Sequence, residues 1–166
     1  MEEIARVAGI SKARMYHLFA GRREVFAEVV AEDARTLAGE VVLESAMAPD
    51  LPGKIRSIVD VFFRFVQRKR HRHRILYTEA DSSEPELAEL LLRVRGALAE
   101  NLTQQLAAAL PQGGERARLM AHAVIAMAEG SATAWGAGPH IEMDRAVLIV
   151  TELALNALGI ERVAPA

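Results

Sequence analysis

The sequence predicts an all-α protein, and three observations lead to this prediction. Ala and Leu, which favour helices, supply much of a hydrophobic fraction of 51%. No window shows the strict alternation of apolar and polar residues that is typical of a half-buried strand. The apolar residues recur instead at helical spacing, between breaks that are rich in glycine and proline. With 166 residues, the chain is long enough to bury most of its apolar surface.

Composition also limits the classes of function. The chain contains no cysteine, which excludes disulfides and cysteine–metal sites and fits a reducing, cytoplasmic environment. Glu2 and Glu3 do not fit the start of a signal peptide, and no apolar run approaches the roughly 20 residues that span a bilayer. A phosphate-binding glycine loop, an HExxH pair and a serine elbow are all absent from the sequence. We therefore expect no enzyme, no metal site and no cofactor.

The first thirty residues hold the most informative pattern. Two short helical stretches, Ile4–Ala8 and Lys12–Leu18, flank a break at Gly9–Ser11. Gly9 can adopt the left-handed conformation that ends a helix, and the Ser11 hydroxyl can cap the helix that follows. Two helices joined by a tight turn that contains glycine predict a helix-turn-helix.

The same segment is basic, although the whole chain has 22 acidic residues against 20 Lys and Arg. All ionisable Lys, Arg, Asp and Glu residues between positions 4 and 23 are cations: Arg6, Lys12, Arg14, Arg22 and Arg23. A local basic surface suits a DNA phosphate backbone. An ordinary solvated helical hairpin is the alternative, because short basic amphipathic helices are common.

This pattern resembles the DNA-binding half of the TetR (tetracycline-repressor-like) family of bacterial transcriptional regulators. The family signature runs approximately Ile-Ala-x-x-Ala-Gly-Val-Ser-x-x-x-Leu-Tyr-x-His-Phe-x-x-Lys-Glu-x-Leu. The chain matches it without gaps at Ile4-Ala5, Ala8-Gly9-Ile10-Ser11, Met15-Tyr16, Phe19, Arg22 and Val25. In three places the chain departs from the family: the family's first helix would precede Met1, Leu18 replaces the usual His, and Arg23 replaces a common acid.

The resemblance implies a ligand-responsive regulator of transcription. Residues 1–30 would form the DNA-binding segment with the start of a connector helix, and residues 31–166 the effector-binding and dimerisation domain. The expected protein is a repressor that binds a near-palindromic DNA operator as a homodimer and is released by a small, mostly apolar effector. Because the first helix is not present, the alternative is a dimeric helical ligand-binding protein that does not bind DNA.

The start and outer face of the second helix would carry the DNA contacts. The residues expected to make them are Ser11, Lys12, Ala13, Arg14, Tyr16, His17 and Arg22. Arg14 suits base readout, because a guanidinium can bridge the two acceptors of a guanine. Ala13 would allow close approach to a thymine methyl group. Tyr16, His17 and Arg22 suit phosphates, as the matching positions of the family suggest.

Six further helices are expected after this segment. Their approximate bounds are Arg22–Ala46, Lys54–Arg70, Ile75–Asp81, Pro85–Leu110, Glu115–Trp135 and Asp144–Leu158. The first of them would connect the DNA-binding segment to the body, and the stretch Ala48–Gly53 would break the chain after it. The basic run Arg68–Arg74 is expected at a solvated helix end, with a weak attraction to DNA as the alternative.

The helices after the connector would enclose the effector pocket. The expected lining residues are Phe62, Phe63, Val66, Tyr77, Leu91, Met120, His122, Met127 and Trp135. Ligand pockets are rich in apolar and aromatic side chains, and His122 and Trp135 could supply polar groups. Core packing is the alternative for the phenylalanines, gap filling for the methionines, and a hydrogen-bonded core or interface position for His122.

The last two expected helices predict a dimer interface. Helix 115–135 is rich in Ala and Gly, so another helix can approach it closely, and helix 144–158 is apolar on nearly every side. A helix of that kind must be buried on nearly every side, which one subunit of this size cannot easily achieve. A four-helix interface in a C2 dimer would satisfy both helices, and the resemblance implies the same arrangement. The expected contact residues are Ala126, Gly130, Ala134, Val147, Val150, Thr151, Ala154 and Leu158.

Overall fold

The computed structural model describes residues 1–69, 85–109, 114–138 and 141–160, and these residues form α-helices and the turns between them. The helices are α1 (Glu2–Val7), α2 (Lys12–Leu18), α3 (Arg22–Met47), α4 (Leu51–Arg68), α7 (Pro85–Ala109), α8 (Glu115–Ala137) and α9 (Met143–Leu158). The all-α prediction is therefore confirmed for the described residues. The expected helix 75–81, with Tyr77, and most of the basic run 68–74 lie outside them.

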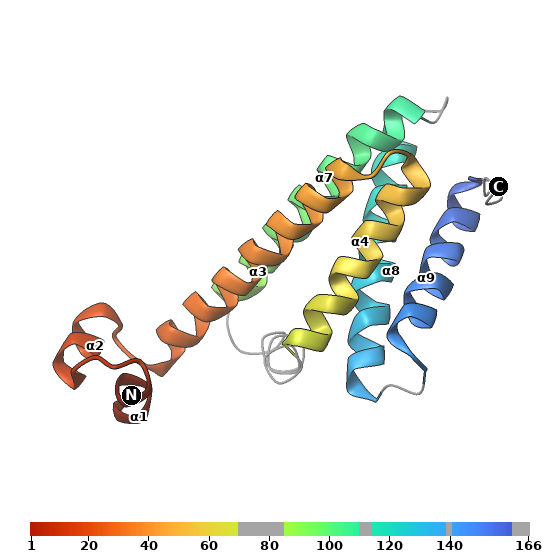
Figure 1. The fold of residues 1–166 in the computed structure, drawn as a ribbon. Coiled ribbons are helices and arrows are strands. Elements are labelled where there is room, and N and C mark those ends of the chain that lie inside the picture. Colours follow the sequence, from red (N-terminus) through yellow and green to blue (C-terminus); the bar gives the residue numbers. More distant parts are fainter. Residues whose placement is uncertain (70–84, 110–113, 139–140, 161–166) are drawn as a thin grey trace.

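The helices form a small head and a larger body that share the long helix α3 (Figure 1). The head consists of α1 and α2, which contact each other at one end of α3. In the body, α4 packs against α3, α8 and α9, while α7 packs against α3 and α8. Because α3 begins at the head and continues along the body, a movement of α3 against its neighbours would also move the head.

Each part has its own apolar cluster. In the head, the buried side chains of Met1, Ala5 and Met15 pack together with less buried neighbours, of which Val25 comes from α3. In the body, one large cluster joins α3, α4, α7, α8 and α9. Within it α4 buries eight apolar residues, more than any other helix. Hydrophobic burial therefore makes α4 the central helix of the body.

The start of α4 differs from the sequence-based expectation. The predicted break extended to Gly53, but the helix already begins at Leu51, so Pro52 and Gly53 lie in its first turn. Asp50 caps the helix, because its side-chain Oδ1 accepts a hydrogen bond from the Gly53 backbone N–H at 2.8 Å. Proline fits here because a residue in the first turn needs no backbone N–H for the helix.

The helices α4 and α8 approach each other closely near the C-terminal end of α8. A Cβ atom added to Gly136 would lie 2.4 Å from Cγ1 of Val66, which is too close for any other residue to fit without movement. Beside this contact, the rings of Phe63 and Trp135 pack with their centroids 5.6 Å apart.

Among the described helices, none has the length and apolar character of a membrane-spanning segment.

Candidate DNA-binding head and effector cavity

The turn between α1 and α2 has the geometry that the sequence predicts. Gly9 has a φ of 68°, in the left-handed region where glycine is favoured. Ser11 caps α2, since its Oγ accepts a hydrogen bond from the Arg14 backbone N–H at 3.2 Å. On the apolar side of α2, the Met15 side chain is buried in the apolar cluster of the head. These contacts fix which face of α2 points outward.

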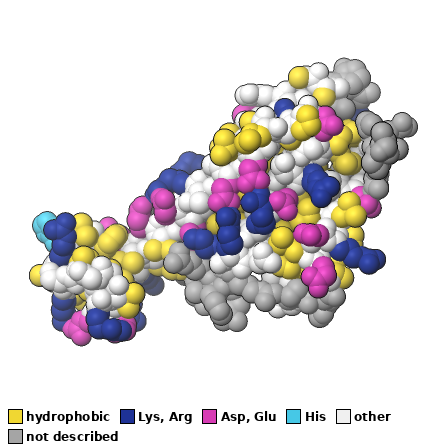
Figure 2. All heavy atoms as spheres, viewed as in Figure 1, with side chains coloured by type: hydrophobic (Ala, Val, Ile, Leu, Met, Phe, Trp, Pro, Cys, Tyr) yellow, Lys and Arg dark blue, Asp and Glu magenta, His cyan; other side chains and the backbone are white. Residues whose placement is uncertain are grey.

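That outward face carries the residues expected to contact DNA. All of them are exposed: Ser11, Lys12, Ala13, Arg14, Tyr16 and His17 on or beside α2, and Arg22 at the start of α3. Figure 2 shows Lys and Arg side chains and a histidine on the outer surface of the head, away from the body. The structure thus leaves all the predicted DNA-contact residues exposed, on or beside α2 and at the start of α3.

Two carboxylates of α1 reach cations in or near this surface. Glu2 pairs with Lys12, and the hydrogen bond from Lys12 holds the pKa of Glu2 below its usual range. Glu3 pairs with Arg6, and that hydrogen bond likewise lowers the pKa of Glu3. Arg14 and Arg22 make no such pair with any described residue. The basic pattern of residues 4–23 does not predict either pair, because Glu2 and Glu3 lie before its first residue.

A side chain of α3 also holds the turn that precedes this helix. The Glu24 carboxylate accepts a hydrogen bond from the Ala20 backbone N–H, one turn before it. A carboxylate in the first turn of a helix also interacts favourably with the positive end of the helix dipole. Glu24 therefore stabilises the junction between the head and α3, close to Arg22.

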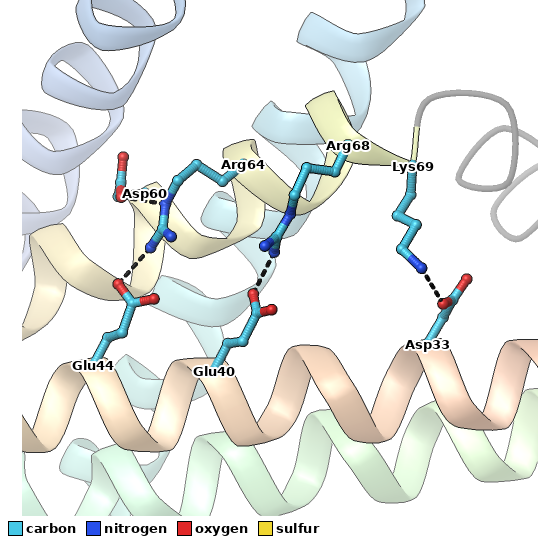
Figure 3. A network of polar contacts seen from close by, with 7 residues as sticks. All are labelled: Asp33, Glu40, Glu44, Asp60, Arg64, Arg68 and Lys69. Atoms are coloured by element: carbon cyan, nitrogen blue, oxygen red, sulfur yellow. Dashed lines mark hydrogen bonds and ion pairs between the residues drawn. The ribbon is translucent and has the colours of Figure 1, made fainter.

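Further along α3, three ion pairs connect this helix to α4 and its C-cap residue (Figure 3). Asp33 pairs with Lys69 at 2.8 Å, Glu40 pairs with Arg68, and Glu44 pairs with Arg64. Arg64 also donates to Asp60 of its own helix at 2.7 Å. Burial lowers the pKa of Arg64, but its hydrogen bonds to Glu44 and Asp60 outweigh that effect and raise it.

The neighbouring side of α3 lines a cavity in the body. The lining residues come from four helices: Val30, Ala34, Leu37, Phe62, Phe65, Leu91, Val94, Arg95, Leu98 and Glu129. The free volume is about 20 Å³, which is room for about one water molecule. A larger ligand would fit only if α3, α4, α7 and α8 moved apart.

The structure brings two of the predicted pocket residues, Phe62 and Leu91, to this cavity. Phe63 and Trp135 instead pack on each other, and the Trp135 Nε1–H donates to the Ile141 carbonyl at 3.0 Å. The remaining predicted residues lie elsewhere: Val66 is in the core, Met120 and Met127 pack against it, and His122 is exposed. For these residues, core packing or surface exposure replaces the expected pocket position.

Two charged lining residues were missed at the sequence level. Glu129 stands alone among small and apolar neighbours on α8, and its side chain is nearly buried. Arg95, on α7, donates to it in a bidentate arrangement, with Nη2–Oε1 at 2.7 Å and Nε–Oε2 at 2.8 Å. A single acid within an apolar stretch was the available signal, but its partner lies 34 residues away.

The predicted dimer interface is only partly exposed. On α8, Ala126, Gly130 and Ala134 are exposed in this chain. On α9, the predicted residues Val147, Val150, Thr151, Ala154 and Leu158 are buried within this chain, in which α4 and α8 pack against the helix. The apolar residues of α9 that remain exposed are Leu148, Ile149 and Leu153. The outer face of α8 and α9 is therefore apolar, but through a different side of α9.

Comparison with known proteins settles the family. A family model described as "Tetracyclin repressor-like, C-terminal domain" matches residues 51–156, which cover α4, α7, α8 and most of α9. The chain belongs to the tetracycline-repressor-like (TetR) family. Members of this family are transcriptional regulators rather than enzymes.

Two solved structures of bacterial regulatory proteins share the fold along nearly the whole chain. A fatty acid degradation regulator, FadR, from Bacillus halodurans aligns with a TM-score of 0.76 at 20% identity, covering 97% of this chain and 88% of that one. A TetR-family regulatory protein from Rhodococcus RHA1 aligns with a TM-score of 0.74 at 17% identity, covering 97% and 86%. Both alignments include the head as well as the body.

A curated relative is similar in sequence. The HTH-type transcriptional activator FasR of Mycolicibacterium smegmatis is 24% identical over 135 residues, which are 81% of this chain. The chain spans 62% of the length of that relative. The similarity therefore concerns part of a longer protein.

Proposed function

We propose that this TetR-family regulator is a repressor that binds a near-palindromic operator as a homodimer and is released by a small, mostly apolar effector. In this proposal, residues 1–30 supply the DNA contacts, and residues 31–166 bind the effector and form the dimer. The observation that supports it best is α3, which carries the head at one end and lines the cavity with Val30, Ala34 and Leu37.

The head suits a DNA major groove. Residues at the start of a recognition helix reach base edges, while flanking polar groups contact phosphates. Arg14 is exposed there and lacks an ion pair with any described residue, so its guanidinium is available to a guanine. Lys12 would exchange the Glu2 carboxylate for a phosphate when DNA binds. Tyr16, His17 and Arg22 would hold phosphates beside it.

Effector binding would act on the head through α3. Because the cavity has room for about one water molecule, a bound effector would have to displace its walls. One of these walls is α3, so its displacement would change the position of the head relative to that of the second subunit. A ligand that favours such a state shifts the population away from the DNA-binding one.

The effector is expected to be largely apolar, because eight of the ten lining residues of the cavity are apolar. The name of the Bacillus halodurans neighbour, a fatty acid degradation regulator, agrees with a ligand related to an alkyl chain. Activation is the second candidate for the direction of regulation, since the Mycolicibacterium smegmatis relative is named an activator.

DNA binding can be tested without knowing the operator. Random-sequence duplexes are enriched on the wild-type protein, and the affinity for the best duplex and for a scrambled duplex is measured by fluorescence anisotropy. We expect Arg14→Ala to weaken binding to the best duplex by about 1–3 kcal/mol and binding to the scrambled duplex far less. Arg22→Ala should weaken both similarly and reduce the salt dependence by about one phosphate contact.

The control is Arg56→Ala, which removes an exposed cation of α4, a helix of the body and not of the head. This variant should bind both duplexes like the wild type. If no duplex is enriched, the proposed DNA binding is wrong. If Arg14→Ala weakens both duplexes equally, Arg14 contacts the backbone and does not read a base.

A further inference from the structure

The effector cavity has one polar wall, and it consists of an ion pair. Arg95 comes from α7 and Glu129 from α8, and they are the two charged residues among those that line the cavity. Eight apolar side chains from α3, α4 and α7 make up the rest of the lining. The polar end of any ligand in this cavity would therefore be expected to face the pair.

The pair is well formed and partly shielded from water. The Nε of Arg95 donates to both carboxylate oxygens of Glu129, at 2.8 and 3.0 Å, and Nη2 donates to Oε1 at 2.7 Å. The Glu129 side chain is 11% exposed and the Arg95 side chain 38%. A planar guanidinium facing a carboxylate in this way is the strongest arrangement of such a pair.

A charged end of a ligand would disturb the charge balance between Arg95 and Glu129. A carboxylate could bind Arg95 only beside or in place of Glu129, which would leave two negative groups on one cation in a poorly solvated site. An ammonium group would place a second cation at Glu129 in the same way. Drawing Arg95 away from Glu129 is unfavourable as well, because the Glu129 side chain is only 11% exposed and its carboxylate would lose its partner.

An uncharged polar end avoids this cost. The Glu129 carboxylate has lone pairs beyond those used by Arg95, so it can accept a hydrogen bond from an amide or a hydroxyl while the pair stays intact. The apolar remainder of such a molecule would lie along the side chains of α3, α4 and α7.

We propose that the effector is a mostly apolar molecule whose polar end is uncharged, and that the Arg95–Glu129 pair excludes carboxylates and amines of the same shape. This inference rests on the proposed function, in which the cavity between α3, α4, α7 and α8 is the effector site.

Three probes of equal chain length test it: decanamide, decanoate and decylamine. Their binding to the wild-type protein is measured by calorimetry near neutral pH, below the concentration at which they form micelles. We expect decanamide to bind at least about tenfold more tightly than either charged probe. Decanoate or decylamine binding as tightly as decanamide would overturn the inference, and so would the absence of binding by all three probes.

Two variants show whether the pair causes the preference. Glu129→Gln removes the carboxylate that repels decanoate, so decanoate should gain affinity relative to decanamide. Arg95→Gln leaves the Glu129 charge, so decylamine should become preferred. The matched control is Glu89→Gln, which removes an exposed ion pair with Arg93 on α7 and should keep the wild-type order of probes. An unchanged order in both cavity variants, with thermal unfolding confirming that they are folded, would overturn the inference.

Failure of this inference can be told apart from failure of the proposed function. The probe series is measured without DNA, and the same probes are then added to the protein–duplex complex. Tight binding of decanamide that leaves DNA affinity unchanged would contradict regulation by the cavity but support the charge selectivity. Release of DNA by decanoate and decanamide at equal concentrations would support regulation by the cavity and overturn the charge selectivity.

Discussion

Gly136 shows how a single residue controls the packing of two helices. With no side chain, it lets α8 approach Val66 of α4 so closely that an added Cβ would lie 2.4 Å from Cγ1 of that valine. The neighbouring Phe63–Trp135 contact depends on the same approach. At this position the absence of a side chain contributes to the stability of the body.

Gly136→Ala should therefore destabilise the protein by about 1–3 kcal/mol, which is the usual cost of overpacking a core. The measurement is urea unfolding followed by Trp135 fluorescence. The matched control is Gly39→Ala in α3, where an added Cβ meets nothing within 4 Å. Because alanine favours helix over glycine, the control should gain roughly 0.5–1 kcal/mol. Equal stability of the Gly136→Ala variant and the wild type would contradict this account of the helix contact.

Local chemistry made several single-residue predictions possible. The cap at Ser11 and the left-handed Gly9 follow from the two residues themselves, and the structure confirms both. The pair of Arg95 and Glu129 could not be predicted in this way, because a contact between residues 34 positions apart depends on how two helices are packed. Within the head, the Glu2–Lys12 pair depends on the angle between α1 and α2, which could not be predicted from the sequence.

At the scale of helices, the position of α3 against α4 depends on apolar contacts and on the ion pairs along one side. Asp33, Glu40 and Glu44 follow one another at helical spacing, and each meets a cation of α4 or its C-cap. The cavity residues Val30, Ala34 and Leu37 occupy the adjacent side. A change in the cavity would therefore be opposed by the ion pairs.

Arg64→Met should destabilise the protein by about 1 kcal/mol, since Arg64 is two-thirds shielded and joins Glu44 of α3 to Asp60 of α4. The loss should shrink at high salt, because screening weakens the wild-type pairs. The comparison is Arg35→Met, which removes exposed pairs within α3 alone and should cost less stability than Arg64→Met. Urea unfolding at low and high salt measures both variants. An equal loss of stability in the two variants would mean that the ion pairs between α3 and α4 do not contribute to stability.

The helix ends were largely predictable, whereas the orientation of α9 was not. Glycine, proline and capping residues mark most helix ends. Pro52 is an exception, because the sequence predicts a break there, whereas the residue lies inside the first turn of α4. A helix that is apolar on nearly every side contains no pattern that says which side faces its own chain. The sequence therefore predicted that α9 would be buried but misplaced the side that its own chain covers.

At the scale of the whole molecule, α8 and α9 leave an apolar face without cover in one chain. Leu119 of α8 and Ile149 and Leu153 of α9 are between 48% and 73% exposed. The small residues Ala126, Gly130 and Ala134 continue this face along α8 and permit close helix packing. We expect a second copy to cover it, giving the two heads that a near-palindromic operator requires.

Leu153→Glu should convert the dimer to a monomer, because it would place a charge in an apolar interface. Sedimentation velocity measures the change, and binding to the enriched duplex should weaken with it. Leu92→Glu is the matched control: Leu92 is 64% exposed on α7, away from this face, and the variant should remain a dimer. A dimer that survives Leu153→Glu would show that the subunits meet elsewhere.

The central claim is that the cavity and the head are coupled through α3, and it can be measured without an effector. Ala34→Met enlarges a cavity-lining side chain of α3, whereas Thr36→Met places the same side chain on the exposed side of the helix. The affinity of both folded variants for the enriched duplex is compared with that of the wild type by fluorescence anisotropy. We expect Ala34→Met to weaken binding about fivefold or more and Thr36→Met to leave it unchanged. Wild-type DNA affinity in a folded Ala34→Met protein would contradict the coupling.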